Sequence, residues 1–275
     1  MEPFNFHAPT SIADSVAALK SAPNGKFLSG GQSLLPVLKL DLAQPSDLVS
    51  LAGLKKELSG VKIDGDNVII GALTTHAEVH ESAEVKQHIH ALQKMAGSIG
   101  DGQVRNRGTI GGSVAHADPA ADYPSAVVAL KATIKTDRRT IAADDFFKGM
   151  FETALAPDEI ILSVSFKKPE KAGYAKFANP SSKYALAGVF VAKHGAEVRV
   201  AVTGASTVVF RLPEFEAALA KNFSADAIKG LKVPQDDLIN ERDAGPEYRA
   251  NLVAVMARRA VEAALAGGAA AANQE

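Results

Sequence analysis

Cysteine and tryptophan are both absent from the 275 residues of this chain, and neither sign of charge dominates it. Without cysteine there is no disulfide, no thiolate nucleophile and no sulfur ligand for an iron–sulfur cluster. The 30 lysines and arginines are balanced by 31 aspartates and glutamates, so no basic surface favours nucleic acid. We expect no nucleic-acid partner, and aromatic contacts with a ligand must come from tyrosine or phenylalanine.

A membrane-spanning stretch is also missing from the sequence. No apolar run reaches the roughly 20 residues that cross a bilayer. The start of the chain, MEPFNFHAPTSIADS, lacks a basic segment followed by an apolar one. We therefore expect a cytoplasmic protein with no membrane span. The apolar fraction of 47% is enough for a sizeable core.

The first two regions of the chain mix helical and strand patterns, which indicates α/β units. In region 1–56, helices are predicted over 11–22 and 33–42, with Ser33 at the cap of the second. The strands of this region are predicted at 26–31 and 47–51. Region 57–170 has a hairpin turn at 64–67, helical composition over 75–99 and an alternating strand within 158–169. Residues 125–137 fit either a helix or a strand that leads into a further strand.

The third region, 171–275, has a different pattern. Alternating segments indicate an antiparallel meander with a hairpin at His194 and Gly195. Helices are predicted over 224–232 and 247–268. The alanine-rich tail 269–275 is expected to fray. Together the three regions predict an α+β protein.

The stretch LSGGQSLL, residues 28–35, is the first candidate binding motif. A strand ends there, Gly30 and Gly31 allow a tight turn, and a helix follows. Successive N–H groups in such a turn can hold an anion. The stretch matches neither the P-loop nor the dinucleotide-binding glycine pattern. The alternative is a plain strand-to-helix turn, which is common.

The stretch RNRGTIGGSVAHADPAADYP, residues 105–124, is the second candidate. It has no evident periodicity, so it is predicted to be irregular. Gly111 and Gly112 allow a ligand close to the backbone, and Asp118 and Asp122 could accept hydrogen bonds from a ligand. The alternatives are a surface loop, and aspartates that only cap turns.

Other polar residues give weaker signals. His76 and His80 have the spacing of metal ligands on one helix face, but no third ligand is evident, and the alternative is solvated helix positions. We expect no metal site, and without GxSxG or a triad we expect no catalytic residue. Lys176 and Tyr184 follow a strand pattern typical of an exposed lysine and a half-buried tyrosine. The DRR turn at 137–139 indicates a charged hairpin end.

Four segments occur in the order of a known family: SGGQSLLP, IGDGQVRNRGTIGGSVAHADPAADYP, DEIILSVSF and YAKF. In them the chain resembles the FAD-binding medium subunit of the molybdenum hydroxylases. That family includes the medium chains of aerobic carbon monoxide dehydrogenase and the flavin domain of xanthine dehydrogenase. The resemblance implies a p-cresol methylhydroxylase-type FAD-binding fold. Its parts would be two α/β subdomains, 1–56 and 57–170, and an antiparallel-sheet-and-helices domain, 171–275, that closes over the flavin.

The resemblance also implies the residues that hold FAD. The pyrophosphate segment comprises Phe27, Leu28, Ser29, Gly30, Gly31, Gln32, Ser33 and Leu34. The second phosphate and ribityl segment comprises Thr109, Ile110, Gly111, Gly112 and Ser113. Further contacts are implied for Ile99, Gly100, Asp122, Ile161, Lys176 and Tyr184. The family often has asparagine at Ser113, and a more basic segment after Lys176.

The implied function is an electron-transfer subunit without its own iron–sulfur or molybdenum centre. Its partners would be a small subunit with [2Fe–2S] clusters and a large molybdopterin subunit, in a dimer of heterotrimers. FAD would pass the electrons to an external acceptor such as a quinone, NAD+ or O2. The alternatives are a stand-alone flavin oxidase or reductase of the same fold, and a binding protein that has lost the flavin.

Overall fold

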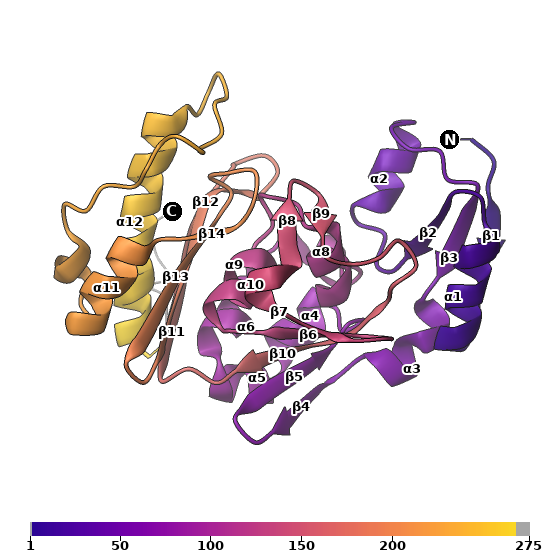
Figure 1. Cartoon of the computed structure of the whole chain (residues 1–275), viewed down its shortest axis with the longest axis horizontal. Helices are drawn as coiled ribbons and strands as arrows, with labels where there is room; N and C mark the ends of the chain where they lie inside the picture. Colours follow the sequence, from indigo (N-terminus) through magenta and orange to yellow (C-terminus); the bar gives the residue numbers. More distant parts are fainter. Residues whose placement is uncertain (1, 268–275) are drawn as a thin grey trace.

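The computed structural model describes residues 2–267, so the predicted tail 269–275 lies outside the described residues. Figure 1 shows an N-terminal lobe that stands apart from a larger body made of two further sheets. The helices are short except for the last one, and none of those in the described part is long and apolar enough to cross a membrane.

The N-terminal lobe is built on a three-stranded parallel sheet in the order β1-β3-β2. Its elements are β1 (Asn5–His7), α1 (Ile12–Ser21), β2 (Gly25–Leu28), α2 (Leu34–Lys39), β3 (Asp47–Ser50), a 3-10 turn (Ala52–Leu54) and α3 (Lys55–Leu58). The predicted helix over 33–42 is shorter than expected. Ser33 stands at its cap position in helical conformation, and its side chain caps nothing. The strand before it ends at Leu28, which leaves residues 29–33 outside regular structure.

The second sheet is antiparallel throughout, in the order β4-β5-β10-β6-β7. Its strands are β4 (Val61–Asp64), β5 (Asn67–Gly71), β6 (Thr133–Thr136), β7 (Thr140–Ala142) and β10 (Ile161–Lys167). The predicted hairpin at 64–67 is confirmed as the β4–β5 turn. The DRR turn is also confirmed as a hairpin end, between β6 and β7. Its arginines pair with Asp158 and Glu159, and so hold the segment before β10 in place.

Several helices pack around this sheet. They are α4 (His76–Glu81), α5 (Ala83–His88), α6 (His90–Gly97), α7 (Gly102–Arg105), α8 (Ile110–His116), α9 (Tyr123–Ala129) and α10 (Ala143–Phe146). The helical prediction for 75–99 resolves into three helices, because Ser82 caps α5 and Ile89 departs from helical backbone. Residues 125–137, which fitted two readings, form the end of α9 and then β6. A small hairpin, β8 (Phe147–Gly149) and β9 (Glu152–Thr153), follows α10.

The prediction of an irregular structure over 105–124 is wrong, because α8 occupies seven of these residues. The run of small residues hides the helical period, and its glycines disfavour a helix on their own. Tertiary contacts supply what propensity lacks. Thr109 caps the helix through its hydroxyl, and the backbone of Gly111 lies against Ala72.

The third sheet is the predicted antiparallel meander, in the order β11-β12-β13-β14. Its strands are β11 (Lys171–Ala178), β12 (Ala185–His194), β13 (Glu197–Thr203) and β14 (Phe210–Arg211). The hairpin at His194 and Gly195 is confirmed, with Gly195 at φ +64. The helices are α11 (Pro213–Lys221) and α12 (Pro246–Leu265), with a 3-10 turn (Ala225–Ile228) between them. Helix α11 is not among the predicted helices, and the helix predicted over 224–232 is only this turn.

Two hydrophobic clusters join the body of the molecule. The larger one fills the space between the second sheet and its helices and reaches Tyr174 and Phe190 of the third sheet. A second one lies between the third sheet and α12. The N-terminal lobe contacts the body through a much smaller cluster around Leu54 and Ile160. The main cleft of the molecule lies beside this narrow contact.

Candidate functional site

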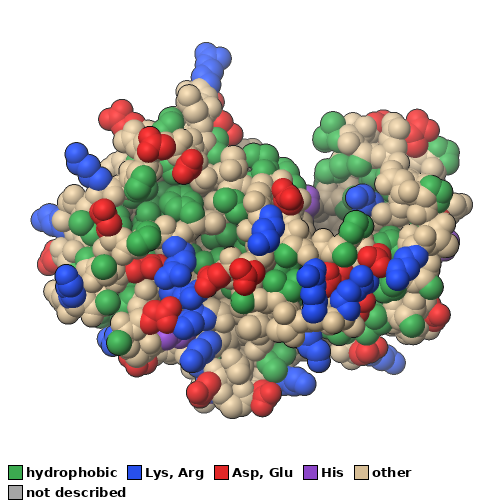
Figure 2. Space-filling model, viewed as in Figure 1, with side chains coloured by type: hydrophobic (Ala, Val, Ile, Leu, Met, Phe, Trp, Pro, Cys, Tyr) green, Lys and Arg blue, Asp and Glu red, His purple; other side chains and the backbone are tan. Residues whose placement is uncertain are grey.

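A cavity of about 670 Å³ lies between the N-terminal lobe and the body. Figure 2 shows the surface hollowed between the two parts. The volume falls within the roughly 300–1,000 Å³ of small-molecule and cofactor pockets. Its wall combines the segment after β2, the start of α8, the beginning of β10 and the loop before β12. Segments from all three sheets thus meet at one cavity.

The segment at residues 29–33 forms one wall of this cavity. No group in the described part of the chain accepts a hydrogen bond from its five backbone N–H groups. Gly31 has φ +77, a conformation that favours glycine. At Gly30 an added Cβ would lie 2.1 Å from the carbonyl oxygen of Arg107, so the two segments are in close contact. The turn is therefore a preformed row of donors that can hold an anion.

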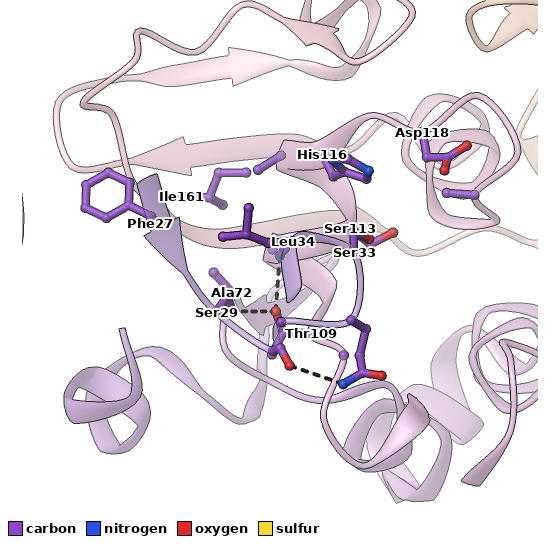
Figure 3. A pocket seen from close by; sticks show the side chains of 18 of the residues that line it. Phe27, Ser29, Ser33, Leu34, Ala72, Thr109, Ser113, His116, Asp118 and Ile161 are labelled. Carbon is purple, nitrogen blue, oxygen red and sulfur yellow. Dashed lines mark hydrogen bonds between the residues drawn. The ribbon is translucent and has the colours of Figure 1, made fainter. Parts of the chain in front are cut away.

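The start of α8 forms the adjoining wall (Figure 3). The hydroxyl of Thr109 accepts from the N–H of Gly112 at 3.1 Å and shares a 2.8 Å hydrogen bond with the hydroxyl of Ser29. The N–H groups of Ile110 and Gly111 donate to the carbonyls of Thr74 and Ala72. The first amides of α8 are thus occupied within the protein. This wall offers close approach and hydroxyls, while the free donors come from residues 29–33.

Asp122 directly precedes α9 and contacts β11 of the third sheet. It is buried, accepts from the hydroxyl of Tyr174 at 2.5 Å, and pairs with the ammonium of Lys176 at 2.9 Å. Burial raises the pKa of Asp122, and the charge of Lys176 and the hydroxyl of Tyr174 oppose this shift. Lys176 also donates to the carbonyls of Ser98 and Lys183. The expectation of an exposed lysine on pattern alone is therefore wrong.

Most of the residues expected at the site line the cavity. They are Phe27, Leu28, Ser29, Gly30, Gly31, Gln32, Ser33, Leu34, Ile99, Gly100, Thr109, Gly111, Gly112, Ser113, Asp122, Ile161 and Tyr184. Ile110 and Lys176 do not. Ile110 is fully buried in the core behind α8, and Lys176 is held behind Asp122 by its three oxygen partners. Asp118 lines the cavity as well, and its carboxylate shapes the loop by accepting from the N–H of Ala120.

Two histidines differ from their predicted solvated positions. His76 is only 5% exposed, lies at the cavity wall, and its Nδ1 has no partner in the described part of the chain. Burial, with a smaller effect of the charge on Arg105, lowers its pKa to about 4. His80 is partly buried and bonds Gln93. Among the described residues no group of three His, Cys, Asp or Glu could hold a metal ion.

Three further residues at the site were not among the expected contacts, although Arg105 and Tyr174 belong to the segments RNRG and YAKF. Arg105 donates to the carbonyls of Ile99 and Gly100 and so fixes the turn that lines the cavity. Tyr174 orients Asp122, and Phe151 reaches the cavity from the β8–β9 turn. Phe151 lies outside those segments, and the contacts of all three residues become evident only in the tertiary structure.

The fold places a cavity with free backbone donors between a small parallel-sheet lobe and a larger body, and such a cavity can hold an anionic ligand. Comparison with known proteins agrees. Residues 2–168 match the family described as the FAD binding domain in molybdopterin dehydrogenase. The chain therefore belongs to this family, and FAD is its cofactor.

Relatives extend the match to almost the whole chain. The chain is 36% identical to the nicotine 6-hydroxylase medium subunit of Paenarthrobacter nicotinovorans, covering 93% of this chain and 95% of that protein. It is 34% identical to the carbon monoxide dehydrogenase medium chain of Hydrogenophaga pseudoflava, covering 96% and 97%. The structure superposes on reconstituted CO dehydrogenase from Oligotropha carboxidovorans with a TM-score of 0.86, at 30% identity over 96% and 98%. This chain is accordingly an oxidoreductase subunit of the medium-chain type.

Proposed function

We propose that this chain is the FAD-carrying electron-transfer subunit of a molybdenum-containing hydroxylase or dehydrogenase complex. The observation that carries the proposal is the row of unpaired backbone N–H groups at residues 29–33, which line the cavity beside the capped start of α8. The pyrophosphate of FAD is the anion that such a row suits. When bound, FAD supplies the redox chemistry, and the protein supplies binding, orientation and electrostatics.

The lining of the cavity supports a proposed placement of the cofactor. The donors of residues 29–33 hold the pyrophosphate, and Gly112 and Ser113 allow its continuation to approach α8. Ile99, Gly100 and Ile161 give the cavity apolar walls for the rings. Asp122 lines the cavity and accepts a hydrogen bond from the cofactor, and the ammonium of Lys176 pairs with its carboxyl group. Tyr184, which is 42% exposed, lines the outer part of the cavity.

The same proposal extends to the fold. We assign it to the p-cresol methylhydroxylase type, with subdomains 1–56 and 57–170 and a C-terminal domain 171–275. The division is supported by the three larger sheets, which fall one into each range. The third sheet reaches the cavity through the loop before β12, where Lys183 and Tyr184 line it. The C-terminal domain thereby closes one side of the site.

In this proposal, electrons reach the chain from a partner subunit. The chain itself has no cysteine for an iron–sulfur cluster, and its relatives are named as medium chains or medium subunits. We therefore propose an iron–sulfur small subunit and a molybdopterin large subunit as partners, in a dimer of heterotrimers. An external acceptor then takes the electrons from FAD. The substrate is oxidised on the large subunit, so no acid–base residue of this chain touches it.

The alternative is a stand-alone flavin oxidase or reductase of the same fold. The two functions differ in what reduces the flavin. Purification of the tagged chain from its native host, with metal analysis of the eluate, separates them. The proposal predicts two co-purifying chains, with iron and molybdenum in the eluate and bound FAD. A chain that purifies alone, and whose flavin is reduced directly by a small donor, would establish the alternative.

A further inference from the structure

The β8–β9 turn carries an exposed aromatic side chain in an unusual backbone conformation. Phe151 has φ +56, in the left-handed region that bulky residues rarely adopt. Its side chain is 54% exposed and is not part of the hydrophobic core clusters. A strained conformation that gains no core packing needs another explanation, and such residues concentrate at ligand-binding sites.

Phe151 is hydrogen-bonded to a second residue with left-handed backbone, at the end of α8. Its N–H donates to the carbonyl of Ala117, which is itself in the left-handed region at φ +50 and ends α8. This bond fixes the tip of the hairpin to the end of the helix. Figure 1 shows β8 and β9 beside α8 on the side of the cleft. The backbone of Phe151 is thus anchored to the end of α8, which positions its side chain at the cleft.

The ring of Phe151 lies against the imidazole of His116, with centroids 5.0 Å apart and planes tilted by 41°. Both side chains line the cavity. Burial lowers the pKa of His116, against the opposing charge of Asp118, so its imidazole is neutral at neutral pH. Two uncharged rings at a cavity wall offer flat apolar faces to a planar ligand.

We propose that Phe151, supported by His116, is a binding residue that packs against a planar ring of the bound cofactor. This inference rests on the proposed function, because it takes FAD as the occupant of the cavity. Base–aromatic stacking is worth about 1–3 kcal/mol, which corresponds to roughly a 5- to 150-fold change in affinity. The backbone strain at Phe151 is then the cost of placing its ring.

The neighbouring residue supplies a matched control. Met150 is 51% exposed on the same turn but does not line the cavity. The dissociation constant of FAD is measured on flavin-free, full-length protein, by flavin fluorescence, for Phe151→Ala, Phe151→Tyr and Met150→Ala. We expect Phe151→Ala to weaken FAD binding about 5-fold or more, while Phe151→Tyr and Met150→Ala stay near the wild type.

A glycine variant separates binding from folding. Phe151→Gly relieves the left-handed strain, so the Tm of the flavin-free protein should stay level or rise while FAD affinity falls. FMN distinguishes the ring: its affinity falls with that of FAD if Phe151 packs on the isoalloxazine, and is unchanged if it packs on adenine. Equal FAD affinity of Phe151→Ala and wild type would overturn this inference alone. So would a Tm of Phe151→Gly that falls in step with its affinity. Failure of the wild type to bind FAD would instead refute the proposed function.

Discussion

Two adjacent glycines of α8 offer a test that separates the folding of the site from cofactor binding. At Gly111 an added Cβ would lie 2.6 Å from the Cβ of Ala72 and 2.7 Å from its carbonyl oxygen. The backbone must shift to relieve this contact, at a cost of about 1–3 kcal/mol. We expect Gly111→Ala to lower the Tm of the flavin-free protein by roughly 2–10 °C.

The same substitution one residue later has a different surrounding. At Gly112 an added Cβ meets the hydroxyl of Thr109 at 2.9 Å, and the next contacts, with Ser29, are at 3.6 Å or more. Alanine also favours a helix over glycine by up to about 1 kcal/mol. We expect Gly112→Ala to change the free energy of unfolding by less than about 1 kcal/mol, because this gain offsets the shift of Thr109.

For FAD affinity the effect of the two positions is reversed, because a larger side chain at Gly112 enters the cavity. Gly112 lines the cavity, so Gly112→Leu places a side chain in the proposed cofactor position and should weaken FAD binding about 10-fold or more. Thermal unfolding of flavin-free protein and FAD titration together measure both effects. If Gly112→Leu bound FAD as tightly as the wild type, the cofactor would not lie against α8, and the placement would be wrong. Valine at Gly111 or Gly31 is a poorer probe, because a Cβ at Gly111 meets the backbone of Ala72 and Gly31 has a φ of +77 that strains any other residue.

Three other changes test the surrounding structure. Thr109→Val removes a helix cap and the hydrogen bond to Ser29, so the free energy of unfolding, measured by denaturant titration, should fall by about 2 kcal/mol. Thr109→Ser should stay near the wild type. His76 has a folded-state pKa of about 4 against 6.5 for the ordinary group, so stability should be full above pH 6.5 and decline as the pH falls toward 4. The loss should be about 2 kcal/mol between pH 7 and pH 5, and His76→Gln should abolish it; an unchanged pH profile would contradict this. Lys176→Met leaves Asp122 buried without its cation and should lower the free energy of unfolding by about 3 kcal/mol or more. A second substitution, Asp122→Asn, should restore part of this stability.

Local patterns predicted much of the fold. The β4–β5 and β12–β13 hairpins and the long last helix follow from turn residues and apolar periodicity, and the structure contains all three. The failures have a common cause. Tertiary contacts decide the structure of both α8 and α2. The glycines of α8 therefore led to a prediction of irregular structure, and α2 was predicted to be longer than it is. Propensity is a weak prior where packing decides.

Some residues of the candidate site are likewise predictable from sequence, and others only from the tertiary structure. The glycine-rich segments were evident from sequence, because only glycine permits such close backbone approach. The partners of Asp122 could not be found from sequence, because Tyr174 and Lys176 are more than 50 residues away along the chain. The roles of Arg105 and His76 depend on burial and on single carbonyl contacts, which no spacing records.

The most direct test of the central claim is electron transfer between isolated components under anaerobic conditions. The reduced iron–sulfur subunit that co-purifies with this chain is mixed with the FAD-loaded chain, and flavin absorbance is followed by stopped flow. We predict that the flavin absorbance bleaches as the clusters are reoxidised, and that Gly112→Leu, poorly loaded with FAD, leaves the clusters reduced. Clusters that stay reduced beside fully loaded wild-type protein would contradict the account.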